Sequence, residues 1–163
     1  MNADQYNSWS RPLRENPQAA RAVVLANKAV TYVFYLAYPL LIAWLFFNNS
    51  NLWWQALLFP ALGFALVTIM RTAINKPRPY EALDIVSVIP KDTKGKSFPS
   101  RHTYSAWAIA ATVFVWHAPA GIAFFFFALC MAIIRIMGGV HYPIDVLVGA
   151  LIGLAFGLLP LAL

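Results

Sequence analysis

Three short segments concentrate the side chains that could do chemistry. They read RTAINKPRPYE from residue 71, FPSRH from residue 98 and RIMGGVHYPID from residue 135. In the first, Arg71, Lys76 and Arg78 fall within eight residues and predict an anion clamp. The planar guanidinium group of arginine matches two phosphate oxygens at once. Taken alone, these cations equally suit contacts with acidic lipid head groups at a membrane surface. The segment therefore predicts an anion site of one of these two kinds.

The second segment stands where a helix should begin. Ser100 can cap that helix, and the free amides of the first helical turn favour a bound anion. His102 lies within this first turn. A histidine titrates near neutral pH and can donate a proton to a leaving oxygen, although a single histidine at a membrane interface is more often simply solvated.

The third segment joins two predicted helices. Its glycines at 138–139 end the first helix, and Pro143 suits the first turn of the second. His141 then lies just outside the second helix and Asp145 in its first turn, so the two side chains can meet. An aspartate that accepts a hydrogen bond from one ring nitrogen leaves the other free as a nucleophile. Taken singly, a loop hydrogen bond for His141 and a helix-dipole contact for Asp145 are simpler interpretations.

Arg135 lies at the end of a long uncharged stretch. Charged residues in membrane-spanning sequence are expensive, and they usually turn inward to pair or to bind something. We therefore expect Arg135 to face the interior of the protein rather than lipid.

The composition indicates lipid as the solvent. The chain has 163 residues, of which 61% are hydrophobic and 11% charged, whereas about a quarter of an ordinary soluble domain is charged. Uncharged runs cover 29–70, 102–134 and 146–163, and FFNNSNLWW and WHAPAG interrupt the first two. Since a span needs about 20 mostly apolar residues, we predict spans near 28–48, 52–70, 102–117, 119–137 and 143–162. The fold class is thus an all-α polytopic membrane bundle, in one domain over 1–163.

Residues 1–27 are polar and predict an interfacial N-terminal segment rather than a secretory signal. Threading the five spans places this segment, the active-site loop 71–101 and the segment 135–145 on one face of a membrane, which we expect to be the plasma membrane. All 12 Lys and Arg residues lie on that face. The positive-inside rule makes it cytoplasmic, although several of these cations could be present for a ligand instead.

The combination of the three segments is more specific than its parts. It resembles the three-part signature of the type 2 phosphatidic acid phosphatase superfamily, which are histidine phosphatases related to vanadium haloperoxidases. The matching positions are Arg71, Arg78, Pro79, Pro99, Ser100, His102, Arg135, His141 and Asp145.

The resemblance implies a metal-independent lipid phosphatase that acts on a phospholipid or a polyprenyl phosphate or diphosphate. In the family's scheme, the residue matching His141 attacks phosphorus to form a phosphohistidine, that matching Asp145 orients it, and that matching His102 protonates the leaving oxygen. Phosphate oxygens would be held by the residues matching Arg71, Arg78, Ser100 and Arg135.

The sequence departs from the family pattern in four ways. Arg71 replaces the usual lysine, Arg101 replaces a glycine, and Ile134 replaces a serine. Many lipid phosphatases of the family also have six spans, against the five expected here. Arg101 adds a cation to the phosphate-binding set and could contact a second phosphate, as in a prenyl diphosphate.

Other functions fit parts of the same pattern. A protein that binds or transports lipid head groups, without turnover, would use the cation cluster alone, and a phosphatase for small soluble esters would use the same pocket. No metal or other cofactor is expected, because His102, His141 and Asp145 lack a compact ligand motif and the arginines would repel a metal. Nucleic-acid binding is disfavoured, since the cations crowd onto short membrane-adjacent loops. The expected partners are the bilayer and a lipid phosphate, and the sequence indicates neither the lipid nor an oligomeric state.

Overall fold

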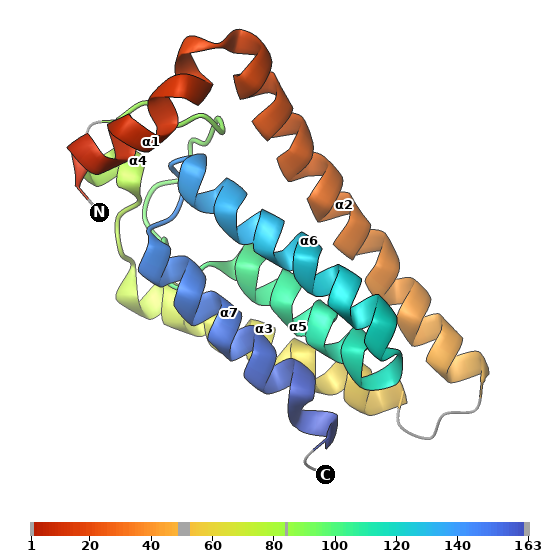
Figure 1. Ribbon diagram of the computed structural model, residues 1–163. Coiled ribbons are helices and arrows are strands. Elements are labelled where there is room, and N and C mark those ends of the chain that lie inside the picture. Colours follow the sequence, from red (N-terminus) through yellow and green to blue (C-terminus); the bar gives the residue numbers. More distant parts are fainter. Residues whose placement is uncertain (1, 49–52, 84, 162–163) are drawn as a thin grey trace.

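The computed structural model describes residues 2–48, 53–83 and 85–161. Their regular structure is entirely helical (Figure 1), which confirms the predicted all-α class. The elements are α1 (Ala3–Glu15), α2 (Pro17–Phe47), α3 (Trp53–Ile74), the short α4 (Pro79–Ala82), α5 (Arg101–Trp116), α6 (Ala118–Met137), α7 (Pro143–Leu158) and a final 3-10 turn η1 (Leu159–Leu161).

The five predicted spans correspond to α2, α3, α5, α6 and α7. Within the described residues, four helical segments are long and apolar enough to cross a membrane: Pro17–Phe47, Trp53–Ala82, Ala118–Met137 and Pro143–Leu161. α5 has 16 residues and so measures about 24 Å, less than the roughly 30 Å of a bilayer core. It lies inside the bundle, where α7, α6, α3 and α2 all contact it. The predicted turn within 49–52 and the predicted span end at 162 lie outside the described residues.

Capping residues set the helix boundaries. The side chain of Asn16 accepts hydrogen bonds from two amides of α2, and Ser100 caps α5 as predicted. His117 caps α6, and Pro143 is the first residue of α7. The side chains of Asn16, Ser100 and His117 satisfy amides that would otherwise lack partners at the helix starts. Pro143 suits a helix start because it has no N–H that needs a partner.

The N-terminal region is helical, whereas the sequence analysis predicted only that residues 1–27 form a polar interfacial segment. Residues 3–15 form α1, and α2 begins at Pro17, so the helix that contains the first predicted span starts about 11 residues before that span. The polar residues of 17–27 obscured the helix because hydropathy marks lipid exposure, whereas Asn16 and Pro17 mark the helix start. At about 1.5 Å per residue, α2 is roughly 46 Å long and extends past the other helices at its N-terminal end.

α5 and α7 approach each other closely along a stripe of glycines. A Cβ atom on Gly149 would lie 2.6 Å from the carbonyl oxygen of Ser100, and one on Gly153 would lie 2.6 Å from that of Tyr104. Gly157 continues the stripe one turn later, against Ala108. Small residues at this spacing let two backbones touch, which is how helices associate in lipid, where burial of apolar area provides little drive.

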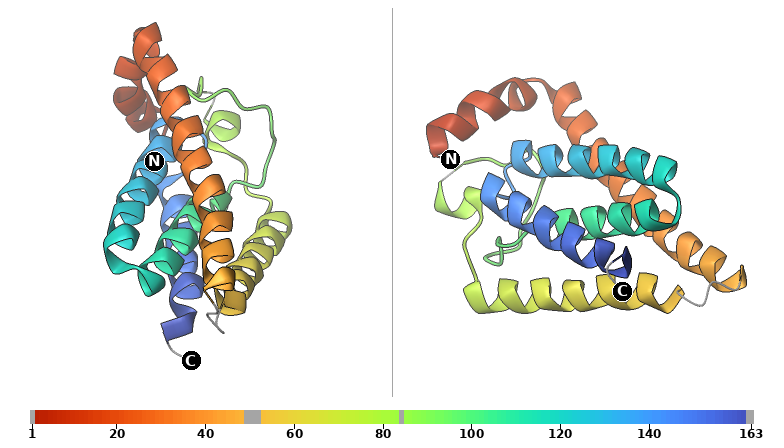
Figure 2. Two further views of the ribbon diagram at one scale, coloured as in Figure 1. Left: turned by 90° about the vertical axis from the view of Figure 1, so that its right-hand side faces the viewer. Right: turned by 60° about the horizontal axis from the view of Figure 1, so that its bottom comes forward.

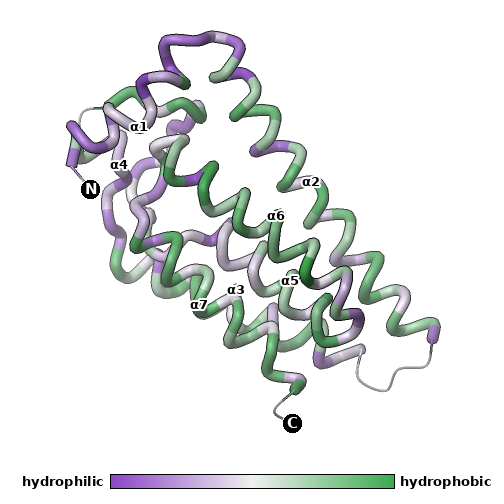
Figure 3. Tube along the Cα trace, viewed as in Figure 1, coloured by the Kyte–Doolittle hydropathy of each residue, from purple (hydrophilic) through white to green (hydrophobic). Residues whose placement is uncertain are grey.

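The two ends of the bundle differ in polarity. α1, the start of α2 and the loop between α3 and α5 gather at one end and carry most of the hydrophilic residues, while the C-terminus lies at the opposite end (Figure 3). α2 runs obliquely along the outside of the bundle, as the turned views in Figure 2 also show. The polar end is therefore the place where the three signature segments can meet.

Candidate active site

A pocket of about 280 Å³ opens at the polar end. It is lined by Thr68, Arg71, Thr72, Arg78, Lys91, Thr93, Lys96, Arg101, His102 and His141. Five of these residues are lysines or arginines and none is acidic, so the pocket favours an anion. Each of the three signature segments contributes to this lining, through Arg71 and Arg78, His102, and His141. The signature residues Pro79, Pro99, Ser100, Arg135 and Asp145 do not line it.

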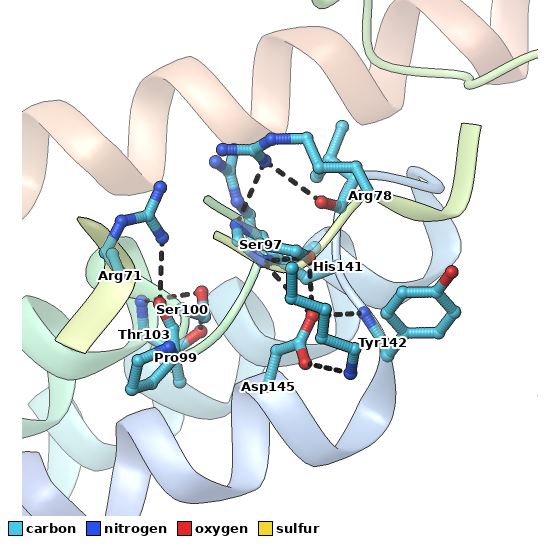
Figure 4. A network of polar contacts seen from close by, with 12 residues as sticks. Arg71, Arg78, Ser97, Pro99, Ser100, Thr103, His141, Tyr142 and Asp145 are labelled. Atoms are coloured by element: carbon cyan, nitrogen blue, oxygen red, sulfur yellow. Dashed lines mark hydrogen bonds and ion pairs between the residues drawn. The ribbon is translucent and has the colours of Figure 1, made fainter. Parts of the chain in front are cut away.

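His141 lies between the pocket and a buried carboxylate (Figure 4). Its Nδ1 is 3.8 Å from Oδ2 of Asp145, so the predicted meeting of the two residues is confirmed. The hydroxyl of Ser97 lies between them, 3.4 Å from Nδ1 of His141 and 2.5 Å from Oδ2 of Asp145. Ser97 thus links the ring to the carboxylate.

Asp145 is fully buried and has several further partners. The amide of Tyr142 donates a hydrogen bond to its Oδ2 at 3.1 Å, and Lys76 forms a 2.8 Å ion pair with its Oδ1. The Lys76 ammonium also lies over the Tyr142 ring, 4.3 Å from the centroid. Lys76 was expected to join the anion clamp of the first segment, but it forms an ion pair with the Asp145 carboxylate instead.

The contacts of His141 fix its tautomer. Nη1 of Arg78 lies 3.4 Å from Nε2 of His141. Because arginine can only donate, Nε2 must be the accepting nitrogen and Nδ1 carries the hydrogen. Burial lowers the pKa of His141 from its ordinary 6.5, while the nearby Asp145 carboxylate acts in the opposite direction. The ring is therefore neutral at pH 7, with the accepting lone pair of Nε2 on the side of the pocket.

Backbone carbonyls orient the two arginines of the first segment. Arg78 donates to the carbonyl of Val140 and to that of Gly95, each at 3.1 Å, and Arg71 donates to the carbonyl of Pro99 at 2.8 Å. Both side chains are buried. Each guanidinium has five N–H donors, so donors remain for an anion in the pocket.

His102 is held by an arginine as well. Nη2 of Arg135 lies 3.0 Å from Nδ1 of His102, which makes Nδ1 the acceptor and leaves the hydrogen on Nε2. Arg135 is 2% exposed, as the expectation of an inward-facing side chain requires. Its Nη1 donates to Oδ1 of Asn27 on α2 at 3.0 Å. Arg135 does not line the pocket, so in this structure its contact with the site runs through His102.

Ser100 lies outside the pocket lining, whereas Arg101 lines the pocket but is exposed. Ser100 is fully buried, and its hydroxyl shares a 2.9 Å hydrogen bond with that of Thr103, outside the pocket lining. Arg101 is exposed, and its guanidinium lies over the ring of Phe64, 5.4 Å from the centroid. It faces both the pocket and the apolar surface beside it.

An apolar groove continues from the pocket along α2. A cavity of about 250 Å³ shares Arg101 and His102 with the pocket. A second of about 320 Å³ shares Phe34, Tyr35 and Phe64 with the first, and a third of about 400 Å³, at the far end of α2, shares Tyr38 and Leu57 with the second. From Thr31 to Phe47 this groove follows α2 for roughly 24 Å.

Comparison with known proteins relates this arrangement to a family. Residues 52–162 match the sequence model of the PAP2 superfamily. The chain belongs to the PAP2 superfamily. The family predicted from the three-segment signature is thereby confirmed. The structure resembles the crystal structure of LpxE from Aquifex aeolicus, with a TM-score of 0.76 and 28% identity over 99% of this chain and 95% of that one.

Two curated PAP2 relatives carry names that bear on function. The bacitracin transport permease protein BcrC of Bacillus licheniformis is 30% identical over 125 residues, which cover 74% of this chain and 61% of the relative. The undecaprenyl-diphosphatase BcrC of Bacillus subtilis is 29% identical over 136 residues, which cover 80% of this chain and 69% of the relative. This chain thus spans about three fifths to two thirds of their length.

The structure adds Ser97, Lys76 and Asn27 to the PAP2 signature residues. Ser97 and Asn27 had no role in the sequence analysis, and the role given to Lys76 was wrong. The only available signal for Asn27 was a polar side chain in an otherwise apolar stretch, VVLANKAV. Ser97 adjoins FPSRH, but its contact with Asp145 spans 48 residues of sequence and depends on the path of the loop.

Proposed function

We propose that this protein is a metal-independent membrane lipid phosphatase that removes a terminal phosphate through a phosphohistidine at His141. One observation carries the proposal: the accepting nitrogen of a neutral His141 faces a pocket lined by five cations, while its N–H faces Ser97 and Asp145. That is the arrangement a nitrogen nucleophile needs against phosphorus.

In the first step, the lone pair of Nε2 attacks phosphorus, an N–P bond forms, and the bond from phosphorus to the leaving oxygen breaks. The electron pair of that bond stays on the leaving oxygen. If this oxygen belongs to a phosphate, it accepts a hydrogen bond from the Nε2–H of His102; if it is an alkoxide, it takes that proton. The ring of His141 becomes positively charged, which the Asp145 carboxylate stabilises through Nδ1–H and Ser97. Arg71 and Arg78 neutralise the charge of the transferred phosphoryl group.

In the second step, a water molecule attacks phosphorus and the N–P bond breaks. The electron pair returns to Nε2, so His141 is neutral again. For a diphosphate substrate, both hydrogens of the water leave with the product as dihydrogen phosphate. For a monoester, one hydrogen replaces the proton that His102 gave to the alkoxide, and the product is hydrogen phosphate. Both cases balance without a metal-bound hydroxide. In the described part of the chain, no group of three or more His, Cys, Asp or Glu side chains is placed to hold a metal ion.

The groove along α2 favours the proposal that the substrate is a lipid. A head group in the cationic pocket would place its apolar chain against Phe34, Tyr35 and Phe64, and the groove continues from there to the far end of α2. A relative of this chain is named an undecaprenyl-diphosphatase. A substrate with a long apolar chain, rather than a small soluble ester, fits both observations.

The test is phosphate release by the purified protein in detergent, with a chelator present, from a polyprenyl diphosphate, phosphatidic acid and a soluble phosphate ester. We expect chelator-resistant release that is lost in His141→Ala. We also expect a phosphoenzyme, trapped by denaturation in alkaline detergent, that is stable in base and labile in acid, as phosphoramidates are. A well-folded protein without release, or with full activity in His141→Ala, would overturn the proposal.

A transporter is the second candidate, because another relative is named a transport permease. It predicts retained ligand binding and transport in His141→Ala, with no phosphate release. The phosphatase predicts the reverse, since the cations that bind the head group remain in this variant while the nucleophile is gone.

We also propose that the protein lies in the plasma membrane. The cations of the polar end favour a cytoplasmic site by the positive-inside rule, while the five that line the pocket have an alternative explanation in anion binding. Lys94→Cys in a Cys130→Ala background separates these possibilities, because an impermeant maleimide labels intact cells only if the site faces outward. A cytoplasmic site predicts labelling only after cell lysis.

A further inference from the structure

The pocket contains more positive charge than one phosphate requires. Arg71 and Arg78, both buried, point to one anion beside His141. Lys91, Lys96 and Arg101 line the same pocket, and none of them forms an ion pair within the described part of the chain. A monoester phosphate carries about −1.5 to −2 charges at pH 7, so three further cations leave a large excess.

Arg101 occupies a distinctive place among these cations. Together with His102, it is shared between the polar pocket and the first cavity of the apolar groove. A lipid with its terminal phosphate at His141 and its chain in the groove must pass this junction. Whatever group joins the terminal phosphate to the chain would therefore lie beside Arg101 and the Nε2–H of His102.

The state of His102 restricts what that group can be. With Arg135 donating to its Nδ1, the ring is neutral. A neutral imidazole gives up its remaining N–H proton far less readily than an imidazolium, but it still donates a good hydrogen bond. An alkoxide leaving group resembles hydroxide, whose conjugate acid has a pKa of about 15.7, and it needs a full proton. A phosphate leaving group, with a second pKa of about 6, departs as an anion and needs only hydrogen bonds and positive charge.

We infer that Arg101 is a specificity-determining residue that binds the inner phosphate of a lipid diphosphate, the leaving group of the reaction. This inference rests on the proposed function and narrows its substrate to the diphosphate class. In the reaction, the bond from the terminal phosphorus to the bridging oxygen breaks, and the electron pair stays on the lipid monophosphate. Arg101 and the Nε2–H of His102 stabilise that charge, and no proton transfer to the leaving group is required.

The test compares a polyprenyl monophosphate with the diphosphate of the same chain length, by kcat/KM for phosphate release in detergent micelles. We expect wild type to prefer the diphosphate. Arg101→Gly, which restores the residue usual in the family, should lower kcat/KM for the diphosphate about tenfold, as loss of a charge-assisted contact does, and that for the monophosphate less than about twofold. Arg101→Lys should recover part of the preference, because it restores the charge.

Lys94→Ala is the matched control, since Lys94 is an exposed cation of the loop before α5 and does not line the pocket. It should leave both substrates unaffected. Equal use of the two substrates by wild type, or an equal loss for both in Arg101→Gly, would overturn the inference. Arg101→Gln provides the same comparison if the glycine variant is unstable. Failure of the proposed function itself looks different: neither substrate would release phosphate, and His141→Ala would change nothing.

Discussion

Lys76 and Asp145, 69 residues apart in the sequence, form a 2.8 Å ion pair beside His141, the candidate nucleophile. The carboxylate is fully buried, whereas the Lys76 side chain is 32% exposed. Removing the ammonium would leave the buried charge with hydrogen bonds alone, which is costly in a low-dielectric interior. The Lys76 ammonium therefore stabilises the folded protein, and it helps to hold the carboxylate that orients His141.

Lys76→Ala should lower the free energy of unfolding by about 2 kcal/mol, below the 3–5 expected of fully buried pairs because Lys76 reaches solvent. It should also reduce kcat, since Asp145 is then free to shift. Thermal unfolding in detergent and phosphate release measure the two effects. Lys76→Arg keeps the charge and should recover most of the stability. An unchanged melting temperature in Lys76→Ala would show that the pair contributes little.

Ser97→Ala should reduce kcat about tenfold with little change in KM, because the hydroxyl that links His141 to Asp145 is lost while the pocket cations remain. The control is Ser87→Ala in the same loop, whose hydroxyl donates only to the carbonyl of Ile89 and should leave activity unchanged. Steady-state kinetics on one substrate decide between these outcomes. If the two variants behaved alike, Ser97 would have only a structural role.

Much of this architecture could be predicted from the sequence, because helix boundaries depend on neighbouring residues. Ser100, Pro143 and the glycines after α6 mark helix boundaries by rules that involve only neighbouring residues. Because the spans alternate in direction, those boundaries also bring His102 and His141 to one end of the bundle.

The partners of the site residues could not be predicted in the same way. Lys76 and Ser97 are placed by the loop between α3 and α5, which folds back on itself where the Ser97 amide donates to the carbonyl of Lys76 at 2.9 Å. Gly95 and Lys96 adopt positive φ angles of 61° and 54° in this loop. Such a path depends on tertiary contacts, among them the Arg78 hydrogen bond to Gly95, and has no periodic pattern in the sequence.

Gly153→Val should destabilise the bundle, because its first added carbon would lie 2.6 Å from the Tyr104 carbonyl and 2.9 Å from the Ala108 amide. Both are backbone atoms of α5, so relief requires the helices to separate, at a cost of about 1–3 kcal/mol or more. Leu151→Val, on the exposed side of α7, is the control and should leave the melting temperature within a degree or two, roughly the effect of a surface change. Equal melting temperatures for the two variants would contradict the close packing.

The buried, neutral His141 predicts how stability depends on pH. Because burial lowers its pKa in the folded protein, the unfolded chain binds a proton more readily, and this contribution is fully present above the ordinary histidine value of 6.5. As the pH falls below 6.5, the unfolded state gains a proton that the folded state rejects, and stability declines until the folded pKa is passed. Melting temperatures measured from pH 8 to pH 4 should fall more steeply for wild type than for His141→Gln, which cannot titrate. Parallel curves would show that His141 is not held neutral by its surroundings.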